Sequence, residues 1–237
     1  MCSILLDDFM KKGEKPLSVQ NYEKLLQIDT DGWRTDLKKS KHHHRYEPTP
    51  YAALDALFWE YDLSKEDTVV DFGSGKGRVP FYIHSRFENI VKGIEMSETL
   101  HKEALQNKLT FRQKVRRGKG NIRFKQVLAE QYPIKPEDTH FYFFNPFTVH
   151  NFKQVVANII QSGIDYPRKT DIILYYPTLD YIRFLETSTP FRAEYDIEIP
   201  KLTDEDEHQR FLIYRVTEEK WESIRSSNEQ TDDLRIS

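Results

Sequence analysis

The amino-acid sequence predicts an α/β fold: a doubly wound seven-stranded sheet, mostly parallel, with helices on both faces and a C-terminal antiparallel hairpin. Strand-like and helix-like segments alternate through five units, which is typical of a parallel sheet covered by helices. Right-handed crossovers restrict such a sheet to doubly wound topologies. Two strand-like segments separated by acidic, turn-rich residues follow the last unit and predict the terminal hairpin at 193–216.

The length of the chain bounds its domain organisation. At about 150 residues per domain, 237 residues leave room for one domain with extensions. Hydrophobic residues make up 38% and charged residues 31%, enough for a sizeable core beneath a well-solvated surface. We expect one Rossmann-like domain over residues 46–216. A polar, partly helical extension over 1–45 precedes it, and a tail over 217–237 that need not be ordered follows it.

Composition argues against several classes of protein. No run approaches the roughly 18–20 apolar residues of a membrane helix, so we expect no membrane partner. The first residues carry acids within a short apolar stretch and lack a small-residue cleavage site, which argues against a signal peptide and favours a cytoplasmic protein. Cys2 is the one cysteine, so an intrachain disulfide and a cysteine-rich zinc site are excluded. The net charge of −3 does not indicate a nucleic-acid-binding chain.

Local patterns predict the first elements. Leu54, Leu57 and Phe58 recur at helical spacing. Pro80 stands where the first turn of a helix tolerates a missing N–H, and Ser97 is a good N-cap. In chain order we expect a helix within 18–27, a helix at 51–63, a strand at 68–73, a helix after Gly77, a strand at 89–95 and a helix from Ser97 to about Leu109.

Similar patterns predict the later elements. The run THFYFFN is nearly all apolar or aromatic, as expected for a strand buried on both faces. Apolar residues between 149 and 160 recur with the period of an amphipathic helix. In chain order we expect strands at 121–129 and 139–145, a helix from Val149, a strand at 171–176, a helix over 178–186, and strands at 193–200 and 210–216.

The chain is poor in glycine, with 9 among 237 residues, or about 4% against the usual ~7%. Three of these, Gly73, Gly75 and Gly77, stand between a predicted strand and the helix that follows. Such a turn lets a ligand approach the backbone without a Cβ in the way and aims helix N–H groups at it. Ligands of open α/β sheets bind at the carboxyl ends of the central strands, so this turn is the first candidate site.

The spacing of the turn distinguishes between ligands. A P-loop has four residues between its glycines, then Lys and Ser or Thr, but Lys76 stands between glycines here. The dinucleotide fingerprint is G-x-G-x-x-G, and the third glycine comes one residue early. Asp71 precedes the turn, giving D-x-G-x-G-x-G. The segment VVDFGSGKGRV resembles the first motif of the class I (seven-strand) S-adenosylmethionine-dependent methyltransferases. The resemblance implies S-adenosylmethionine as cofactor, bound by Asp71, Gly73, Ser74, Gly75 and Gly77.

A second acid ends the next predicted strand. Glu95 offers two acceptor oxygens, enough for both hydroxyls of a ribose. NAD-binding proteins use a carboxylate in the same way, so Glu95 supports an adenosine cofactor without choosing between the two. We place the neighbouring Met96 in the same site. The family has adenine contacts after the third strand, where Glu130 stands; the alternative for Glu130 is an exposed loop acid.

The fourth predicted strand ends at Asn145-Pro146-Phe147. This tip resembles a shortened Asn/Asp-Pro-Pro-Tyr/Phe motif of methyltransferases acting on exocyclic or amide nitrogen, without the second proline. The resemblance implies a catalytic role and places Asn145 beside the cofactor as well. Asn145 would accept the N–H of the acceptor, Pro146 would restrict the turn, and Phe147 would stack on a planar acceptor or shield the cationic methyl centre. The alternative is a simple turn.

The segment RYEPTPY at 45–51 precedes the first core helix. It resembles a Pro-Thr-Pro segment of a group of seven-strand protein-lysine methyltransferases, alongside a first motif of the DxGSGxGR type. The resemblance implies that Thr49 or Tyr51 closes over the methionine end of the cofactor. The internal run His42–His44 looks like an expression tag, but we treat it as native. A solvated loop is favoured over a metal site there, and no metal is expected.

Charge clusters bear on the methyl acceptor. Lysine and arginine dominate 102–125 and recur over 34–45, which would suit a phosphate backbone, whereas the acids of 204–207 would attract a lysine-rich protein. We expect a methyltransferase acting on nitrogen in a protein or RNA, with a small-molecule acceptor left open. Two alternatives remain. One is a catalytically idle, nucleic-acid-binding module of the same fold. The other is a NAD-dependent Rossmann oxidoreductase, which the early third glycine disfavours.

Overall fold

The computed structural model describes residues 17–32, 46–112, 121–200 and 202–236. At its centre is a seven-stranded sheet with the order β3-β2-β1-β4-β5-β7-β6. Strand β7 runs antiparallel to β5 and β6, and the other pairings are parallel, so the predicted fold class is confirmed. The strands are β1 (Thr68–Phe72), β2 (Ile90–Glu95), β3 (Ile122–Gln126), β4 (His140–Phe143), β5 (Thr170–Tyr175), β6 (Arg192–Glu198) and β7 (Arg210–Val216).

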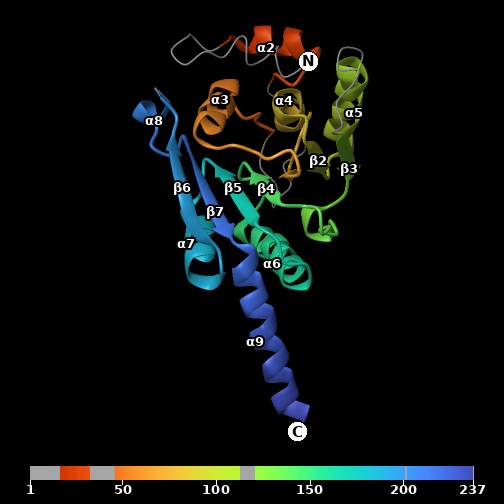
Figure 1. The fold of residues 1–237 in the computed structure, drawn as a ribbon. Helices are drawn as coiled ribbons and strands as arrows, with labels where there is room; N and C mark the ends of the chain where they lie inside the picture. The colour runs from red at the N-terminus through yellow and green to blue at the C-terminus, as the bar shows by residue number, and fades with distance from the viewer. Residues whose placement is uncertain (1–16, 33–45, 113–120, 201, 237) are drawn as a thin grey trace.

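Helices cover both faces of the sheet (Figure 1). Successive strand side chains point to opposite faces. Val69 and Tyr142 therefore join the core under α2, α3 and α4, whereas Val70 and Phe141 join the core under α6, α7 and α9. The helices are α2 (Val19–Leu26), α3 (Tyr51–Glu60), α4 (Arg78–Phe87), α5 (Glu98–Arg112), the 3₁₀ turn η1 (Ala129–Gln131), α6 (Val149–Asp165), α7 (Leu179–Ser188), α8 (Leu202–Glu205) and α9 (Glu218–Ile236).

The expected elements are present with small shifts in their ends. Helix α5 continues to Arg112, three residues past the expected end at Leu109. The acidic stretch between the hairpin strands holds the short helix α8 where a turn was expected. The histidine run 42–44 and much of the two basic segments lie outside the described residues. In the part of the chain that the structure covers, no helix is both long and apolar enough to span a membrane.

Two pieces outside the predicted domain pack against it. Tyr22 of α2 is fully buried, and its hydroxyl donates a hydrogen bond to Asp55 of α3 at 2.8 Å. Trp221 of α9 is also fully buried, and its indole N–H donates to Thr170 at 3.2 Å. A Cβ on Gly163 of α6 would lie 2.5 Å from the Trp221 ring, so glycine leaves room for the indole. The expected tail thus begins as a docked helix, whereas the division at 46 and 216 stays a prediction.

Candidate active site

A cavity of about 340 Å³ lies at the carboxyl ends of β1, β2 and β4, where the sequence predicts a ligand. Its walls come from the glycine turn, the end of β2, the tip of β4 and the segment 46–49. Small-molecule sites usually measure 300–1,000 Å³, so the volume suits one nucleoside-sized ligand. The predicted position of the site is therefore matched by a cavity.

The glycine turn depends on conformations that other residues rarely adopt. Gly73, Gly75 and Gly77 have φ values of 79°, 52° and 93°. A Cβ on Gly73 would lie 2.5 Å from the Cβ of Pro146, and one on Gly75 would lie 2.2 Å from the ring of Tyr46. Gly73 lines the cavity. Gly75 and Gly77 do not line it, and instead turn the chain into α4.

Ser74 lines the cavity, but its hydroxyl is buried against β2. The residue is only 7% exposed, and its Oγ has no hydrogen-bond partner within the described part of the chain. A Cβ on Gly93 of β2 would lie 2.7 Å from this Oγ, so glycine makes room for the hydroxyl. A buried hydroxyl without a partner is uncommon, and this one packs between the glycine turn and β2.

Two buried carboxyl groups line the cavity next to the turn. Glu95 accepts hydrogen bonds from the N–H of Gly75 at 3.0 Å and from the N–H of Ser97 at 2.7 Å. Each carboxylate oxygen has a second lone pair, so these bonds leave Glu95 able to accept ribose hydroxyls as predicted. Burial raises the pKa of Glu95. Asp71 is 4% exposed, and burial followed by the charge of Glu95 raises the pKa of Asp71 well above its usual range.

Arg78 is the one cation among the described residues that line the cavity. Its guanidinium donates to Thr30 Oγ1 at 2.8 Å and to the carbonyl of Thr49 at 3.3 Å. It also lies 3.3 Å from a carboxylate oxygen of Glu23 and 3.6 Å from one of Asp31. The charge of Arg78 is therefore matched by acids from the N-terminal segment, outside the cavity.

The Pro-Thr-Pro segment forms one wall of the cavity, but only one of its two candidates lies there. Thr49 lines the cavity, and its hydroxyl is hydrogen-bonded to the hydroxyl of Tyr142 at 2.8 Å. Tyr51 does not line it. As the first residue of α3 it faces α2, where it stacks on Tyr22 at 4.2 Å and donates to Glu23 at 2.9 Å.

At the tip of β4, too, only some of the candidate residues line the cavity. Pro146 and Phe147 line the cavity as expected. Asn145 does not line it, because its φ of 38° turns the side chain toward β5, where the amide donates to the carbonyl of Tyr176. Phe147 is buried rather than open to a stacking partner, and its carbonyl accepts the Tyr181 hydroxyl at 2.5 Å. The proposed catalytic role of Asn145 stays a prediction.

The two remaining candidates also differ. Met96 lines the cavity and is 39% exposed. Glu130 lies on η1 beside a shallow surface pocket, where its carbonyl accepts the side-chain amide of Asn158 at 2.9 Å, and it does not line the cavity. Its neighbour Ala129 does, together with Val127. The cofactor-binding role of Glu130 stays a prediction, since the motif does not specify which residue of this loop points into the cavity.

The motifs did not identify the apolar wall of the cavity. Ile94, Leu100 and Val127 line it near Glu95, and Phe144 lines it near the tip of β4. Apolar side chains carry no chemical signature in a sequence. Their one signal is their position at or just beyond strand ends, where open α/β sheets bind ligands.

No protein-family model and no curated protein sequence match the chain. Solved structures resemble it at low identity. The human methyltransferase 10 domain containing protein is similar with a TM-score of 0.55 and 10% identity, over 84% of this chain and 93% of that one. A SAM-dependent methyltransferase from Methanosarcina mazei is similar with a TM-score of 0.50 and 13% identity, over 68% and 97%. The likeness and the strand order establish that the chain has the seven-strand fold of class I methyltransferases.

Proposed function

We propose that the protein transfers a methyl group from S-adenosylmethionine to a nitrogen atom of a macromolecule. The observation that carries the proposal is the charge of the cavity. Asp71 and Glu95 are buried acids that line it, and Arg78, its one described cation, is matched by acids outside. S-adenosylmethionine carries a sulfonium, an ammonium and a carboxylate and is cationic overall, whereas NAD carries an anionic pyrophosphate. Coulomb's law therefore favours the first in this cavity.

The lining residues fit the parts of this cofactor. Ile94, Leu100 and Val127 provide an apolar surface beside Glu95, which suits an adenine and its ribose. The carboxyl of Asp71 suits the ammonium of the amino-acid end. The same M. mazei relative that shares the fold is a SAM-dependent methyltransferase, which supports the assignment.

The chain's contribution to the reaction is positioning. The bound cofactor supplies an already activated methyl group, so no acid or base is needed to activate it. Holding the acceptor in line with the methyl group lowers the barrier by removing orientational freedom. The close packing of Gly73 against Pro146 fixes the turn to the tip of β4, and the rings of Phe144 and Phe147 give that side an apolar wall.

Among the described residues, Glu47 and Asp206 lie near Tyr176 beside Phe144, on the side of the cavity where we place the acceptor. Glu47 is exposed and lines the cavity on this side. The ring centroid of Phe144 lies 6.5 Å from that of Tyr176, whose hydroxyl donates to Asp206 at 2.7 Å. Carboxylates here attract the ammonium form of a basic side chain, which must release a proton to solvent before its free amine attacks the methyl group, so of the two macromolecular acceptors we propose a basic protein side chain rather than RNA.

Calorimetric titration tests the cofactor. The protein should bind S-adenosylmethionine and S-adenosylhomocysteine and show no comparable affinity for NAD. A preference for NAD would overturn the proposal and favour the oxidoreductase alternative.

Transfer of a labelled methyl group tests the acceptor. Label should enter a lysine-rich protein more than total RNA, and Glu47→Gln should reduce that transfer while leaving cofactor affinity unchanged. Label in RNA would overturn the choice of acceptor. RNA binding with a strong salt dependence but without transfer to any acceptor would support the idle nucleic-acid-binding module.

A further inference from the structure

Residues 17–32 are here called the N-terminal clasp. The clasp contacts the start of α3 and of α4, next to the cavity, through Glu23. This carboxylate of α2 accepts four hydrogen bonds, from Thr30 N at 2.7 Å, Thr30 Oγ1 at 2.5 Å, Tyr51 Oη at 2.9 Å and Arg78 Nη2 at 3.3 Å. Its donors thus come from the clasp itself, from the start of α3 and from the first residue of α4. Glu23 joins three pieces of chain that are far apart in sequence.

A second set of bonds holds the end of the clasp over the glycine turn. The side chain of Asn107 on α5 accepts from the N–H of Asp29 at 2.8 Å and donates to its carbonyl at 3.0 Å and to the carbonyl of Lys76 at 3.1 Å. Lys76 donates from Nζ to the carbonyl of Asp31 at 2.8 Å. The backbone of the clasp is therefore paired with side chains of the cofactor half of the domain.

The clasp also holds the cavity wall formed by 46–49. Tyr46 donates from its hydroxyl to the carbonyl of Thr30 at 2.6 Å, and Arg78 binds the carbonyl of Thr49 at 3.3 Å. The guanidinium of Arg78 lies 4.5 Å from the ring centroid of Tyr51. Both ends of this wall are thereby tied to groups that themselves contact the clasp.

Release of the clasp would have a direct electrostatic consequence. Arg78 is 4% exposed and would lose both of its nearby acids, Glu23 and Asp31. A buried cation left without partners is strongly destabilising. It would also lie unmatched at the edge of the cavity, where it would oppose the binding of a cationic cofactor.

We propose that the N-terminal clasp is energetically coupled to cofactor binding, with Glu23 as a positioning residue that acts through Arg78. The inference rests on the proposed function, because it takes S-adenosylmethionine or its product as the ligand. Coupling is reciprocal, so cofactor binding must stabilise the docked clasp as much as docking strengthens cofactor binding. A clasp that served only the stability of the fold would lack this coupling.

Amide hydrogen exchange with and without saturating S-adenosylhomocysteine tests the reciprocity. Exchange in residues 19–30 should slow at least tenfold in the complex. The first turns of α9, residues 218–229, serve as internal control and should be unaffected. If the product binds and exchange in 19–30 does not change, the inference is overturned. If the wild-type protein binds neither the cofactor nor its product, the proposed function fails instead.

Variants of two adjacent residues on α2 test whether Glu23 acts on cofactor binding through Arg78. Glu23→Gln should weaken S-adenosylmethionine binding about tenfold, and should also lower the melting temperature of the free protein because Arg78 loses a nearby acid. Tyr22 is on the same helix as Glu23, but its hydroxyl donates a hydrogen bond to Asp55 and does not contact Arg78. Tyr22→Phe removes this hydroxyl and should change the affinity less than twofold. Equal losses of affinity in both variants would overturn the role of Glu23 as a positioning residue. Should Glu23→Gln fail to fold, the exchange experiment on the wild type still decides.

Discussion

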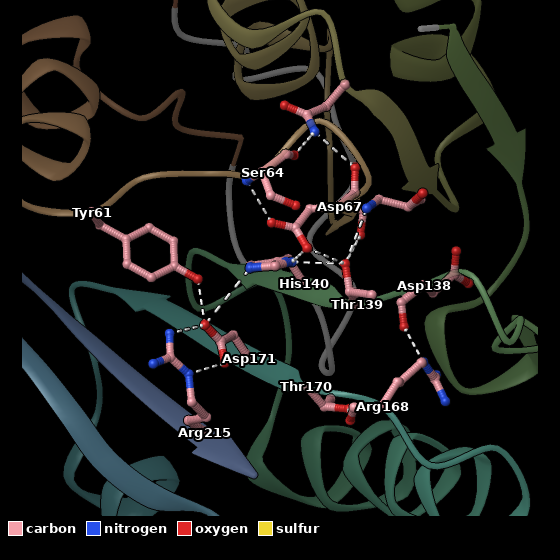
Figure 2. A network of polar contacts seen from close by, with 12 residues as sticks. Tyr61, Ser64, Asp67, Asp138, Thr139, His140, Arg168, Thr170, Asp171 and Arg215 are labelled. Carbon is pink, nitrogen blue, oxygen red and sulfur yellow. Dashed lines mark hydrogen bonds and ion pairs between the residues drawn. The ribbon is translucent and has the colours of Figure 1, made fainter. Parts of the chain in front are cut away.

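Two buried polar networks lie at opposite ends of the parallel strands of the sheet, on different strands. At the amino ends, Asp171 is fully buried and accepts two hydrogen bonds from Arg215, at 2.8 and 2.7 Å, and one from Tyr61 (Figure 2). At the carboxyl ends, Asp71 and Glu95 line the cavity together without a comparable cation between them. The first network pairs opposite charges, and the second brings like charges together.

The pKa values of the two buried aspartates express this difference. Burial by itself raises the pKa of Asp171, but the Arg215 hydrogen bonds and the charge of His140 outweigh it, so the pKa lies below its usual range. Burial raises the pKa of Asp71, and the nearby Glu95 raises it further. A buried carboxylate that is paired with a cation, as Asp171 is with Arg215, stabilises the fold. One that is left unmatched beside a cavity is suited to a cationic ligand.

The largest expected effect comes from breaking the paired network. Arg215→Met should lower the free energy of unfolding by about 3–5 kcal/mol, because Asp171 would remain buried without its cation. Urea denaturation measures this loss. Arg210→Met on the same strand, whose partner Asp196 is half exposed, should change it by no more than about 1 kcal/mol. A loss of cofactor affinity at unchanged stability would contradict the separation of the two networks.

The cavity acids should show the reverse behaviour. Glu95→Ala should weaken S-adenosylmethionine binding by about 1–3 kcal/mol, because hydrogen bonds to a charged group are lost. Glu98→Ala is the matched control, since Glu98 is an exposed acid at the start of α5 paired with Lys102. Titration calorimetry on both variants makes the comparison, and unchanged affinity in Glu95→Ala would remove Glu95 from the site.

The change of cofactor affinity with pH should be smaller than the loss caused by Glu95→Ala, but it should report on Asp71 alone. The ionised carboxyl attracts the sulfonium, so affinity should fall with decreasing pH through the raised pKa of Asp71, above the range where ordinary carboxyls titrate. S-adenosylhomocysteine lacks the sulfonium charge and should depend less on pH. Asp71→Asn should flatten the S-adenosylmethionine profile; a profile that keeps its shape in this variant would assign the titration elsewhere.

The stability of the free protein should respond to the same two aspartates with opposite signs. Asp171, with its lowered pKa, contributes stability at neutral pH that is lost as the pH falls through its folded-state value. Asp71, with its raised pKa, favours the folded state most at low pH, and this contribution is lost as the pH rises. Asp71→Asn should therefore raise stability at neutral pH, which thermal denaturation would detect.

The smallest effect is expected at the tip of β4. Asn145→Ala removes the bond from its amide to the carbonyl of Tyr176 and should lower the free energy of unfolding by about 1 kcal/mol. Thermal denaturation and the rate of methyl transfer are measured together. A large loss of rate with unchanged stability and cofactor affinity would instead support the catalytic role that the sequence motif predicts.

Local patterns predicted the elements of the fold because periodicity and turn residues act over a few positions. The glycine turn and Glu95 could be placed for the same reason, since each directly ends or follows a strand. A motif does not determine where a side chain points: Tyr51 and Glu130 do not line the cavity, and their cofactor-binding roles stay predictions. The partnership of Glu23 with Arg78 joins residues 55 positions apart. It depends on tertiary packing, which the two short motifs do not encode.

The place of β7 in the sheet has a consequence for how the chain is made. Strand β7 is the last strand in sequence, yet it lies between β5 and β6. During synthesis on the ribosome, β6 therefore leaves the exit tunnel before its partner, and the edge of β5 stays open. Unpaired strand edges are prone to aggregation. The nascent chain completes its sheet only after residues 210–216 have been translated, and Trp221 of α9 can dock only after that point.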